Sequence, residues 1–398
     1  MIMKKTTPQG MSTRSVHAGE VRYNEYGSVT TPIVQSSTFI FRGVEEIKKL
    51  CHGAIGRFEY GRYGHPTEVA AEKKLAALEE AEDAILFSSG MSAITTALFA
   101  LLRTGDHIII TDDAYRRTLE FCITCLKRFG IDCTIVKMSD YDAMEKAIQP
   151  NTRLFFSESP TNPYLNIMDL ERLMDIFKKR GILVISDSTF ATPYNQKPLE
   201  FGVDLVIHSA TKYLGGHNDL LSGVVLGRKE LTDPVREYLK ITGGVIDPNS
   251  SYLLIRGLKT FEIRMERLNR NGQIMAEYLE NHPQVKRVYY PGLPSHQHYE
   301  VARRQMKGYG AVVTFEVKDD KDFVLDFLGR LQIASIGPSL GGVESLITHP
   351  ATISYYDKTK AQRKELGIKD GLIRFSVGIE NVEDIIADFD QALAGAGK

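Results

Sequence analysis

The sequence of 398 residues is too long for one ordinary hydrophobic core and predicts two domains. Its 49 basic and 50 acidic residues give a formal net charge of −1, which excludes the strong basic footprint of a nucleic-acid-binding or anionic-membrane-binding protein. The apolar run at 93–102 is far shorter than the ~20 residues of a membrane span, and residues 1–11 lack the apolar segment of a secretory signal. Four cysteines in a chain of this length do not form a disulfide scaffold. We therefore expect a cytoplasmic protein.

Residues 1–60 are rich in Thr, Ser, Gly and Tyr and show little periodicity, which predicts an N-terminal arm or a set of loops. From residue 61 onward, helical patterns alternate with near-continuous apolar runs, typical of strands buried on both faces of a sheet covered by helices. We therefore predict a large domain over 61–250 with a doubly wound, mostly parallel sheet. Its predicted strands are 83–89, 106–113, 132–138, 152–159, 182–187 and 203–209, and its predicted helices are 65–82, 90–105, 117–130, 141–149 and 169–181.

The pattern of residues 251–281 predicts a long helix, bent near Gly257 or Gly272, that leads into a smaller α/β domain at 251–398. The predicted strands of this second domain are 285–291, 310–317, 333–336 and 372–377, and its predicted helices are 322–332 and 382–395.

The motif CITC, at Cys122–Cys125, lies in a segment with helical spacing. Leu119, Cys122, Leu126 and Phe129 would lie along one face, and no second CxxC completes a zinc site, so we interpret both cysteines as core residues. The motif HQH at 296–298 is more typical of a solvated loop than of a metal site. We predict no metal.

The motif GPSLG at 337–341 matches the nucleophile elbow of serine hydrolases. That fold needs an acid and then a histidine on widely separated loops. The only histidine after Ser339 is His349, and the only acid between them is Glu344, so the three residues lie within about ten positions and cannot form widely separated loops. Pro338 also lies inside the supposed elbow. We therefore exclude a serine hydrolase.

Chemically active side chains follow most of the predicted strands of the large domain. Ligands of doubly wound sheets bind beyond the carboxyl ends of the strands, so these side chains should gather at one edge. They are Gly90 and Met91 at a helix start, Tyr115 with Arg116 and Arg117, Asn162, Asp187, and the group Ser209, Thr211 and Lys212.

This set of side chains fits pyridoxal phosphate. A lysine forms the Schiff base, a carboxylate keeps the ring nitrogen protonated, an aromatic ring stacks on the cofactor, and hydroxyls with helix N–H groups hold the phosphate. Each residue alone has an ordinary alternative: Lys212 as a strand cap, Asp187 as a helix cap or turn residue, Tyr115 as packing. Gly215 and Gly216, after Lys212, would allow close backbone approach.

From about Thr13 to the C-terminus, the sequence resembles the pyridoxal-phosphate enzymes of cysteine and methionine metabolism, which have the aspartate-aminotransferase type of fold (fold type I). The resemblance lies in long motifs: YGRYGHPT (60–67), SSGMSAI (88–94), SPTNP (159–163), SDSTFATP (186–193), HSATKYLGGH (208–217), IRGLKT (255–260), PSLGGVES (338–345) and GLIRFSVGIE (371–380).

The resemblance implies a role for each residue of the predicted site. Lys212 would be the Schiff-base lysine, Asp187 would pair with the pyridine nitrogen, Tyr115 would stack on the ring, and Gly90, Met91, Ser209 and Thr211 would bind the phosphate. Tyr60 and Arg62 would reach the phosphate of a neighbouring subunit's cofactor, which implies dimers with shared sites, usually paired as a homotetramer.

Arg374 interrupts the apolar strand LIRFSV, where a lone buried guanidinium is costly unless it meets an anion. A structural ion pair is one alternative. The resemblance supplies another, the α-carboxylate of an amino-acid substrate held bidentately, and it places Asn162 and Ser339 at positions that hold ring or substrate.

The family contains γ-synthases, γ-lyases, β-lyases and sulfhydrylases on one scaffold, and fold does not choose among them. Methionine γ-lyases typically carry Gly-Cys after the stacking tyrosine, and cystathionine γ-lyases usually carry Glu where Pro338 stands; this sequence departs from both. The run YRRT resembles plant-type cystathionine γ-synthases. Arg116 and Arg117 would favour an anionic homoserine ester, unless they are a solvated helix start. We therefore predict a cystathionine γ-synthase, with a cystathionine or methionine γ-lyase or an O-acylhomoserine sulfhydrylase as alternatives.

Overall fold

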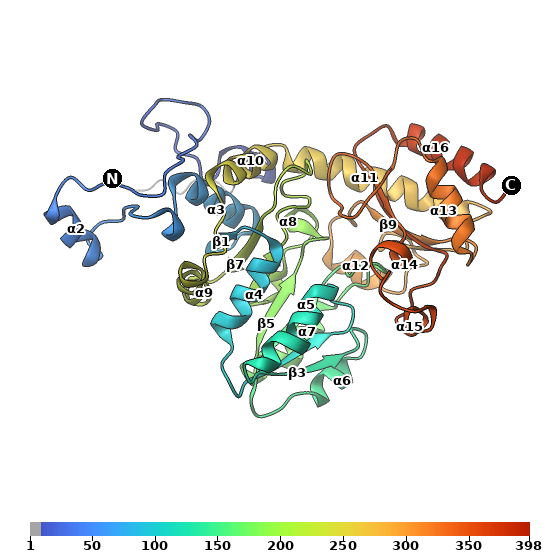
Figure 1. Ribbon diagram of the computed structural model, residues 1–398, viewed down its shortest axis with the longest axis horizontal. Helices are drawn as coiled ribbons and strands as arrows, with labels where there is room; N and C mark the ends of the chain where they lie inside the picture. Colours follow the sequence, from blue (N-terminus) through green and yellow to red (C-terminus); the bar gives the residue numbers. More distant parts are fainter. Residues whose placement is uncertain (1–8) are drawn as a thin grey trace.

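The computed structural model describes residues 9–398, which form two sheets joined by long helices (Figure 1). The larger sheet uses residues 83–227 and the smaller one residues 287–376. This arrangement agrees with a large and a smaller α/β region, while the predicted boundaries at residues 60 and 250 stay predictions.

The larger sheet has seven strands among the described residues, in the order β1-β7-β6-β5-β4-β2-β3. The strands are β1 (Asp83–Phe87), β2 (His107–Thr111), β3 (Asp132–Val136), β4 (Thr152–Glu158), β5 (Leu183–Asp187), β6 (Leu205–His208) and β7 (Gly223–Gly227). All neighbouring pairs from β3 to β6 are parallel, and only β7 runs against its neighbours β1 and β6. The prediction of a mostly parallel sheet is confirmed, but β7 was not predicted, because its short apolar core lies between two glycines.

Helices cover both faces of the larger sheet, as its apolar strands require. One face packs its residues Ile85, Ile185 and Ile207 against α4 (Gly90–Leu101), α9 (Lys229–Thr242) and the π-helical segment η2 (Phe121–Leu126), which continues α5 (Arg116–Glu120). The other face packs on α3 (Pro66–Glu79), α6 (Tyr141–Lys146), α7 (Leu170–Phe177), α8 (Thr192–Asn195) and the short 3-10 turn η4 (Pro198–Phe201). A second 3-10 turn, η3 (Lys178–Arg180), follows α7 and buries no residue.

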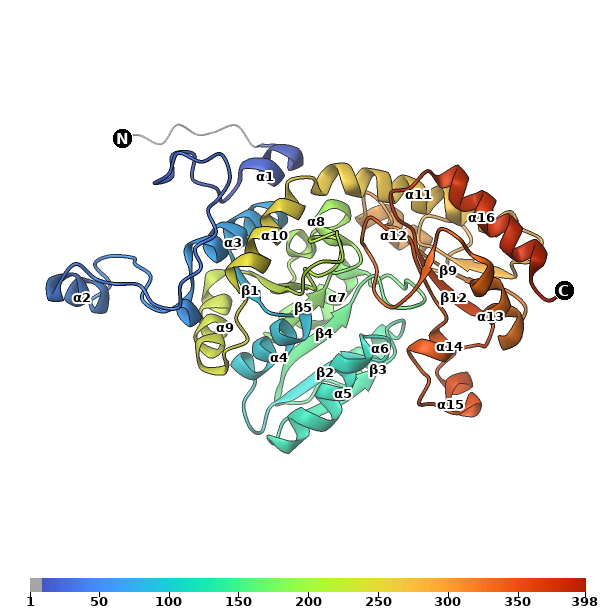
Figure 2. The ribbon, with the colours of Figure 1, turned by 45° about the horizontal axis from the view of Figure 1, so that its top comes forward.

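The predicted long connecting helix is two helices, α10 (Pro248–Leu258) and α11 (Phe261–Asn281). The break falls at Lys259 and Thr260, just after Gly257, whereas the helix runs unbroken through Gly272. Figure 2 shows α11 crossing from the larger sheet to the C-terminal region.

The smaller sheet is ordered β10-β11-β12-β9-β8. Its strands are β8 (Arg287–Tyr289), β9 (Val312–Glu316), β10 (Ser335–Ile336), β11 (Leu346–Thr348) and β12 (Leu372–Ser376), and its helices are α12 (Tyr299–Gln305), α13 (Lys321–Arg330), α14 (Pro350–Ile353), α15 (Lys360–Glu365) and α16 (Val382–Gly395). The core of this part centres on Phe389, whose ring contacts those of Phe315, Phe327 and Phe375. The short elements β11, α12, α14 and α15 were not predicted from the sequence.

The N-terminal part forms an arm that extends away from the two sheets, with α2 (Val44–Cys51) at its tip (Figure 1). The helix α1 (Met11–His17) packs instead on the body, where the buried Lys74 donates to the carbonyls of Ser15 and Val16. The 3-10 turn η1 (Gly61–Tyr63) joins the arm to the body. An arm or a set of loops was predicted for residues 1–60, and the helices α1 and α2 within it were not predicted. The helix α2 buries no residue within the chain.

The structure corrects two details of the predicted loops and faces. Cys122 is buried, as predicted, but Cys125 is only partly buried, and Phe129 is 57% exposed rather than on the core face. His296, assigned to a solvated loop, is buried, and its ring Nε2 lies 3.4 Å from the carbonyl oxygen of Tyr164.

Within residues 9–398, no helix combines the length and apolar character needed to cross a membrane. In the same part of the chain, no cluster of His, Cys, Asp and Glu has the arrangement of a metal site.

We expect Arg236→Met to lower the free energy of unfolding by roughly 3 kcal/mol, because breaking a largely buried ion network leaves a carboxylate unpaired. The Arg236 guanidinium donates to Glu72 at 2.9 Å, to Asp83 at 3.2 Å and to the carbonyl of Ala84 at 2.7 Å, which ties α9 to α3 and β1. Urea unfolding would measure the loss.

Arg228→Met is the matched control, because Arg228 is 58% exposed and pairs with Asp204 at the surface. This change should cost under about 0.5 kcal/mol. Equal losses in the two variants would contradict the proposed importance of the buried network.

Candidate active site

The carboxyl ends of three parallel strands bring the predicted site residues together. Glu158 at the end of β4 is in register with Asp187 at the end of β5, and β6 ends one residue before Ser209. The smaller sheet adds Arg374 from β12 and Ser339 from the loop after β10. The site therefore lies where the two parts of the chain meet.

Lys212 lies in a tight turn beyond β6, and its Nζ donates a hydrogen bond of 2.7 Å to Ser339 Oγ. Burial, with the neighbouring charge of Arg374, lowers the pKa of Lys212 to about 8. An amine with this pKa is still mostly protonated near pH 7, but its neutral fraction is far larger than that of an exposed lysine, and the neutral form can act as a nucleophile or a base. Ser339 has φ of 89°, a conformation that non-glycine residues rarely adopt, which is typical of strained functional positions.

The guanidinium of Arg374 is buried and fixed by oxygen atoms of neutral groups. Its Nη2 donates to the carbonyl of Ser339 at 2.7 Å and its Nη1 to Asn162 Oδ1 at 3.2 Å. Burial lowers the pKa of Arg374 to about 10, and no carboxylate of the described residues lies within ion-pair distance. This geometry disfavours a structural ion pair and suits the capture of a ligand carboxylate.

Asp187 is buried, and both hydrogen bonds described for its carboxylate end on Oδ1. They come from the Thr189 hydroxyl at 2.6 Å and the Thr189 N–H at 3.0 Å. Burial raises the pKa of Asp187. A protonated ring nitrogen placed beside the carboxylate would offset this cost of burial.

Sequence reasoning missed Glu158, which is buried beside Asp187. Its Oε2 accepts the backbone N–H of Tyr115 at 2.7 Å, so it fixes the start of the segment that carries the predicted stacking ring. Burial, together with the charges of Asp187 and Asp113, raises the pKa of Glu158. Its position at the end of a predicted strand could have identified it, because that strand ends at the same edge of the sheet.

Gly90 and Met91 open α4, and Ser209 lies against them. A Cβ on Gly90 would lie only 2.9 Å from the Cβ of Ser209 and 3.1 Å from its Oγ, so only glycine fits here. The Ser209 N–H is held by the Thr189 hydroxyl at 2.8 Å, and the Thr211 hydroxyl accepts the N–H of Ser222 at 2.9 Å. The helix start and the turn before Lys212 thus form one cradle with the positive end of α4.

A cavity of about 640 Å³ lies beside Arg374 and Asn162, lined by Tyr115, Arg116 and Arg117. The Tyr115 side chain is 45% exposed. Arg116 is not a free cation, because it holds Asp357 with two hydrogen bonds of 2.6 and 2.9 Å. Arg117 is more exposed and pairs with Glu120 at 2.6 Å.

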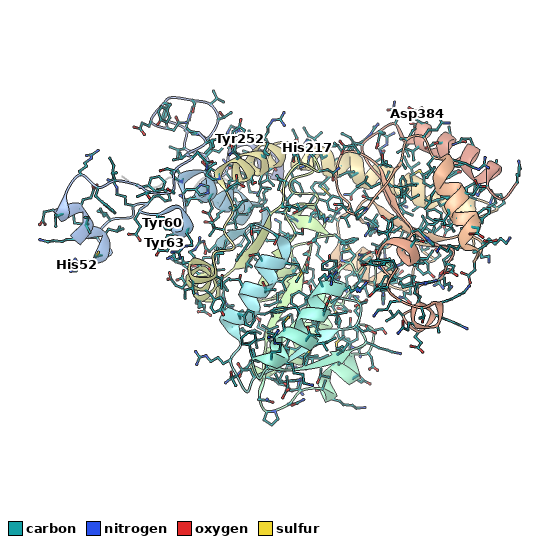
Figure 3. The ribbon with its side chains drawn as sticks, viewed as in Figure 1. His52, Tyr60, Tyr63, His217, Tyr252 and Asp384 are labelled. Atoms are coloured by element: carbon teal, nitrogen blue, oxygen red, sulfur yellow. The ribbon has the colours of Figure 1, made fainter. Side chains whose placement is uncertain are left out.

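Tyr60 and Arg62 do not line this cavity within the chain. Tyr60 and Tyr63 lie where the arm meets the body, at the edge of the molecule (Figure 3). The Arg62 guanidinium lies 4.9 Å from the centre of the Tyr63 ring and donates to the carbonyl of Lys240. Their predicted role toward a neighbouring subunit stays a prediction.

The residues present fit pyridoxal phosphate on several independent counts. Lys212 has a lowered pKa, and the cradle at Gly90 and Ser209 suits a phosphate. Asp187 is a buried carboxylate, and the hydrogen bond from the Thr189 hydroxyl ends on its Oδ1. The fold and the site together define a pyridoxal-phosphate-dependent enzyme with the aspartate-aminotransferase type of fold.

The chain belongs to the family described as "Cys/Met metabolism PLP-dependent enzyme", whose model matches residues 12–394. It is 46% identical over 382 residues to cystathionine gamma-synthase 1, chloroplastic, of Arabidopsis thaliana, covering 95% of this chain and 68% of that one. It is also 46% identical over 396 residues to an L-methionine gamma-lyase of Fusobacterium nucleatum, covering 99% of both chains. The solved cystathionine gamma-lyase of Lactobacillus plantarum, complexed with L-serine, superposes with a TM-score of 0.90 at 36% identity, covering 98% of this chain and 99% of that one.

We expect the reactivity of Lys212 in the cofactor-free protein to rise with pH and to reach half its maximum near pH 8, because only the neutral amine is nucleophilic. Competitive labelling with acetic anhydride, followed by peptide mass spectrometry, would measure the titration. Arg374→Leu should move the midpoint to higher pH, since it removes a neighbouring positive charge. A midpoint near 10.4, the pKa of an exposed lysine, would contradict the geometry.

Proposed function

We propose that this enzyme catalyses γ-replacement on an activated homoserine ester, with cysteine as the thiol, to give cystathionine. The observation that carries the proposal is that Lys212, whose pKa is lowered, and the buried Arg374, which has no carboxylate partner among the described residues, both bond to Ser339, and that Arg374 also lines the cavity. A relative named cystathionine gamma-synthase, at 46% identity, supports the synthase assignment.

Each residue of the site has a chemical task in this proposal. Arg374 binds the substrate α-carboxylate bidentately, with Asn162 and Ser339 fixing its guanidinium. Lys212 takes the α-proton and then moves a proton at Cβ. Tyr115 stacks on the cofactor ring and takes a proton from the substrate amine.

The remaining residues hold the cofactor in this proposal. Pyridoxal phosphate supplies the electron sink that acidifies the α-carbon and β-carbon of the substrate. Asp187 keeps the ring nitrogen protonated, while Gly90, Met91, Ser209 and Thr211 hold the phosphate.

A second candidate function, γ-elimination, is favoured by the charge balance of the cavity. The cationic side chains that line it are matched in number by acidic ones: Arg116, Arg117, Lys358 and Arg374 against Asp112, Asp113, Glu120 and Asp357. The pairing of both Arg116 and Arg117 with carboxylates weakens the argument for an anionic γ-substituent. A relative named L-methionine gamma-lyase also matches over 99% of both chains.

We also propose that the enzyme is a homotetramer built from dimers with shared sites. The support is the arm, which exposes apolar side chains that a partner would cover: Val29 is 97% exposed, Ile40 85% and Tyr23 83%. In such a dimer, Tyr60 and Arg62 would reach the phosphate of the neighbouring subunit's cofactor.

A product assay tests the choice of reaction. The enzyme would be incubated with O-phospho-, O-succinyl- and O-acetylhomoserine, with and without cysteine, and separately with methionine and cystathionine. We expect cystathionine from at least one ester with cysteine. Turnover of methionine without activity on any ester would instead establish the lyase.

The ion pair of Arg117 with Glu120 gives a sharper test of the anionic-ester hypothesis. We expect Glu120→Gln to lower KM for O-phosphohomoserine about two- to fivefold, because it frees an exposed guanidinium whose pairing is worth little. Arg117→Gln should raise the same KM. Neither variant should alter KM for a neutral ester, which is the control; equal changes for both esters would contradict the hypothesis.

A further inference from the structure

The glycines after Lys212 make room for a side chain of this protein. Gly215 and Gly216 were expected to allow close backbone approach near Lys212. In the structure, a Cβ on Gly216 would collide with the guanidinium of Arg264, and one on Gly257 would collide with the carbonyl oxygen of Gly215. Gly216 therefore leaves the space that the Arg264 guanidinium fills, and Gly257 lets the helix α10 approach the backbone of Gly215.

Arg264, in α11, is buried and hydrogen-bonds to backbone carbonyls. Its Nη1 donates to the carbonyl of Tyr213 at 2.7 Å, and its Nη2 donates to the carbonyls of Gly257 at 2.9 Å and Leu214 at 3.3 Å. Among the described residues, no carboxylate lies within ion-pair distance of it. A buried guanidinium without a counter-ion is costly, so its three carbonyl partners must account for its presence.

Two of these carbonyls belong to the residues directly after Lys212. The turn that holds Lys212 is closed by the hydrogen bonds Gly215 N–H to Ala210 O, at 2.8 Å, and Gly216 N–H to Lys212 O, at 2.7 Å. Arg264 caps the carbonyl end of this turn, where a positive charge is favourable. His217, which follows the turn, lies at the top of the molecule beside the helices α10 and α11 (Figure 3).

The same turn sets the position of the Lys212 amine. The Lys212 Nζ lies 2.7 Å from Ser339 Oγ, an oxygen supplied by the smaller sheet. The helix α11 carries Arg264 at its start and packs on the smaller sheet further along, so it contacts both parts of the chain that contribute to this hydrogen bond.

We propose that Arg264 is a positioning residue for Lys212: by fixing the carbonyls of Tyr213 and Leu214, it holds the turn that aims the lysine amine at the reacting atoms. This inference rests on the proposed role of Lys212. Arg264 acts through the backbone, because its guanidinium nitrogens Nη1 and Nη2 bond to main-chain carbonyls.

The test compares Arg264→Met with Arg267→Met. Arg267 lies one turn further along α11, and its guanidinium bonds the Ile379 and Glu380 carbonyls, away from Lys212. Hydrogen exchange of the cofactor-free proteins would report the amides of residues 213–216. We expect Arg264→Met to speed exchange there about tenfold or more while leaving the smaller sheet protected, and Arg267→Met to leave residues 213–216 unchanged.

Kinetics of the enzyme with its cofactor give the second readout. We expect Arg264→Met to lower kcat about 100-fold, the cost of a misplaced catalytic group, while KM stays within about threefold because Arg374 is intact. Arg264→Lys should recover part of the loss, since it keeps the charge but loses the fork of donors. Should Arg264→Met fail to fold, Gly216→Ala, which displaces the guanidinium, replaces it in both measurements. Unchanged exchange at 213–216, or unchanged kcat, would overturn the proposal.

Borohydride trapping separates this inference from the proposed function. Reduction of the wild-type protein with pyridoxal phosphate, followed by peptide mapping, should place the label on Lys212. Label elsewhere would refute the assigned role of Lys212 whatever Arg264 does. Label on Lys212 together with unaltered kinetics of Arg264→Met would refute only the positioning role.

Discussion

The site depends on two cations, the partly buried Lys212 and the buried Arg374, that come from different parts of the chain and meet without a carboxylate between them. Each is stabilised by neutral oxygens, and Ser339 serves both, through its hydroxyl for Lys212 and its carbonyl for Arg374. Burial and the positive charge of Arg374 lower the pKa of Lys212. The lowered pKa gives the amine a larger neutral fraction, which can act as a nucleophile and a base. The repulsion between the two charges also makes the pair a receptor for an anionic substrate.

Backbone groups and buried side chains hold the residues around these two cations in place. Parallel strands end at a common edge, so Glu158 and Asp187 lie side by side, and close approaches at Gly90 and Gly216 bring a helix start and an arginine against the Lys212 turn. Because the contacts are made by backbone or by buried side chains, little reorganisation is needed when substrate binds. The family match does not select one reaction, because relatives named for a γ-synthase and for a γ-lyase are equally identical to this chain, at 46%.

The choice of reaction lies in a different part of the site, where the electrostatics are weaker. Arg116 and Arg117 line the cavity, but each is paired with an acidic side chain, Asp357 or Glu120. Exposed ion pairs of this kind are worth little, so small changes in the residues around them can shift preference between substrates. The ion pair of Arg116 with Asp357 also links the start of α5 to the loop after α14, so both the large and the smaller part of the chain contribute to the cavity wall.

The sequence by itself determined the alternation of strands and helices, the edge at which Lys212, Asp187 and Asn162 gather, and the cofactor that they suit, because continuous apolar runs and strand-end residues are local signals. It could not predict β7, whose apolar core is short, nor the burial of Glu158, nor the carboxylate partners of Arg116 and Arg117. Only the tertiary structure decided that Gly216 accommodates the guanidinium of Arg264, some 50 positions later in the chain. Such pairings depend on which distant segments pack together, and no local pattern encodes that.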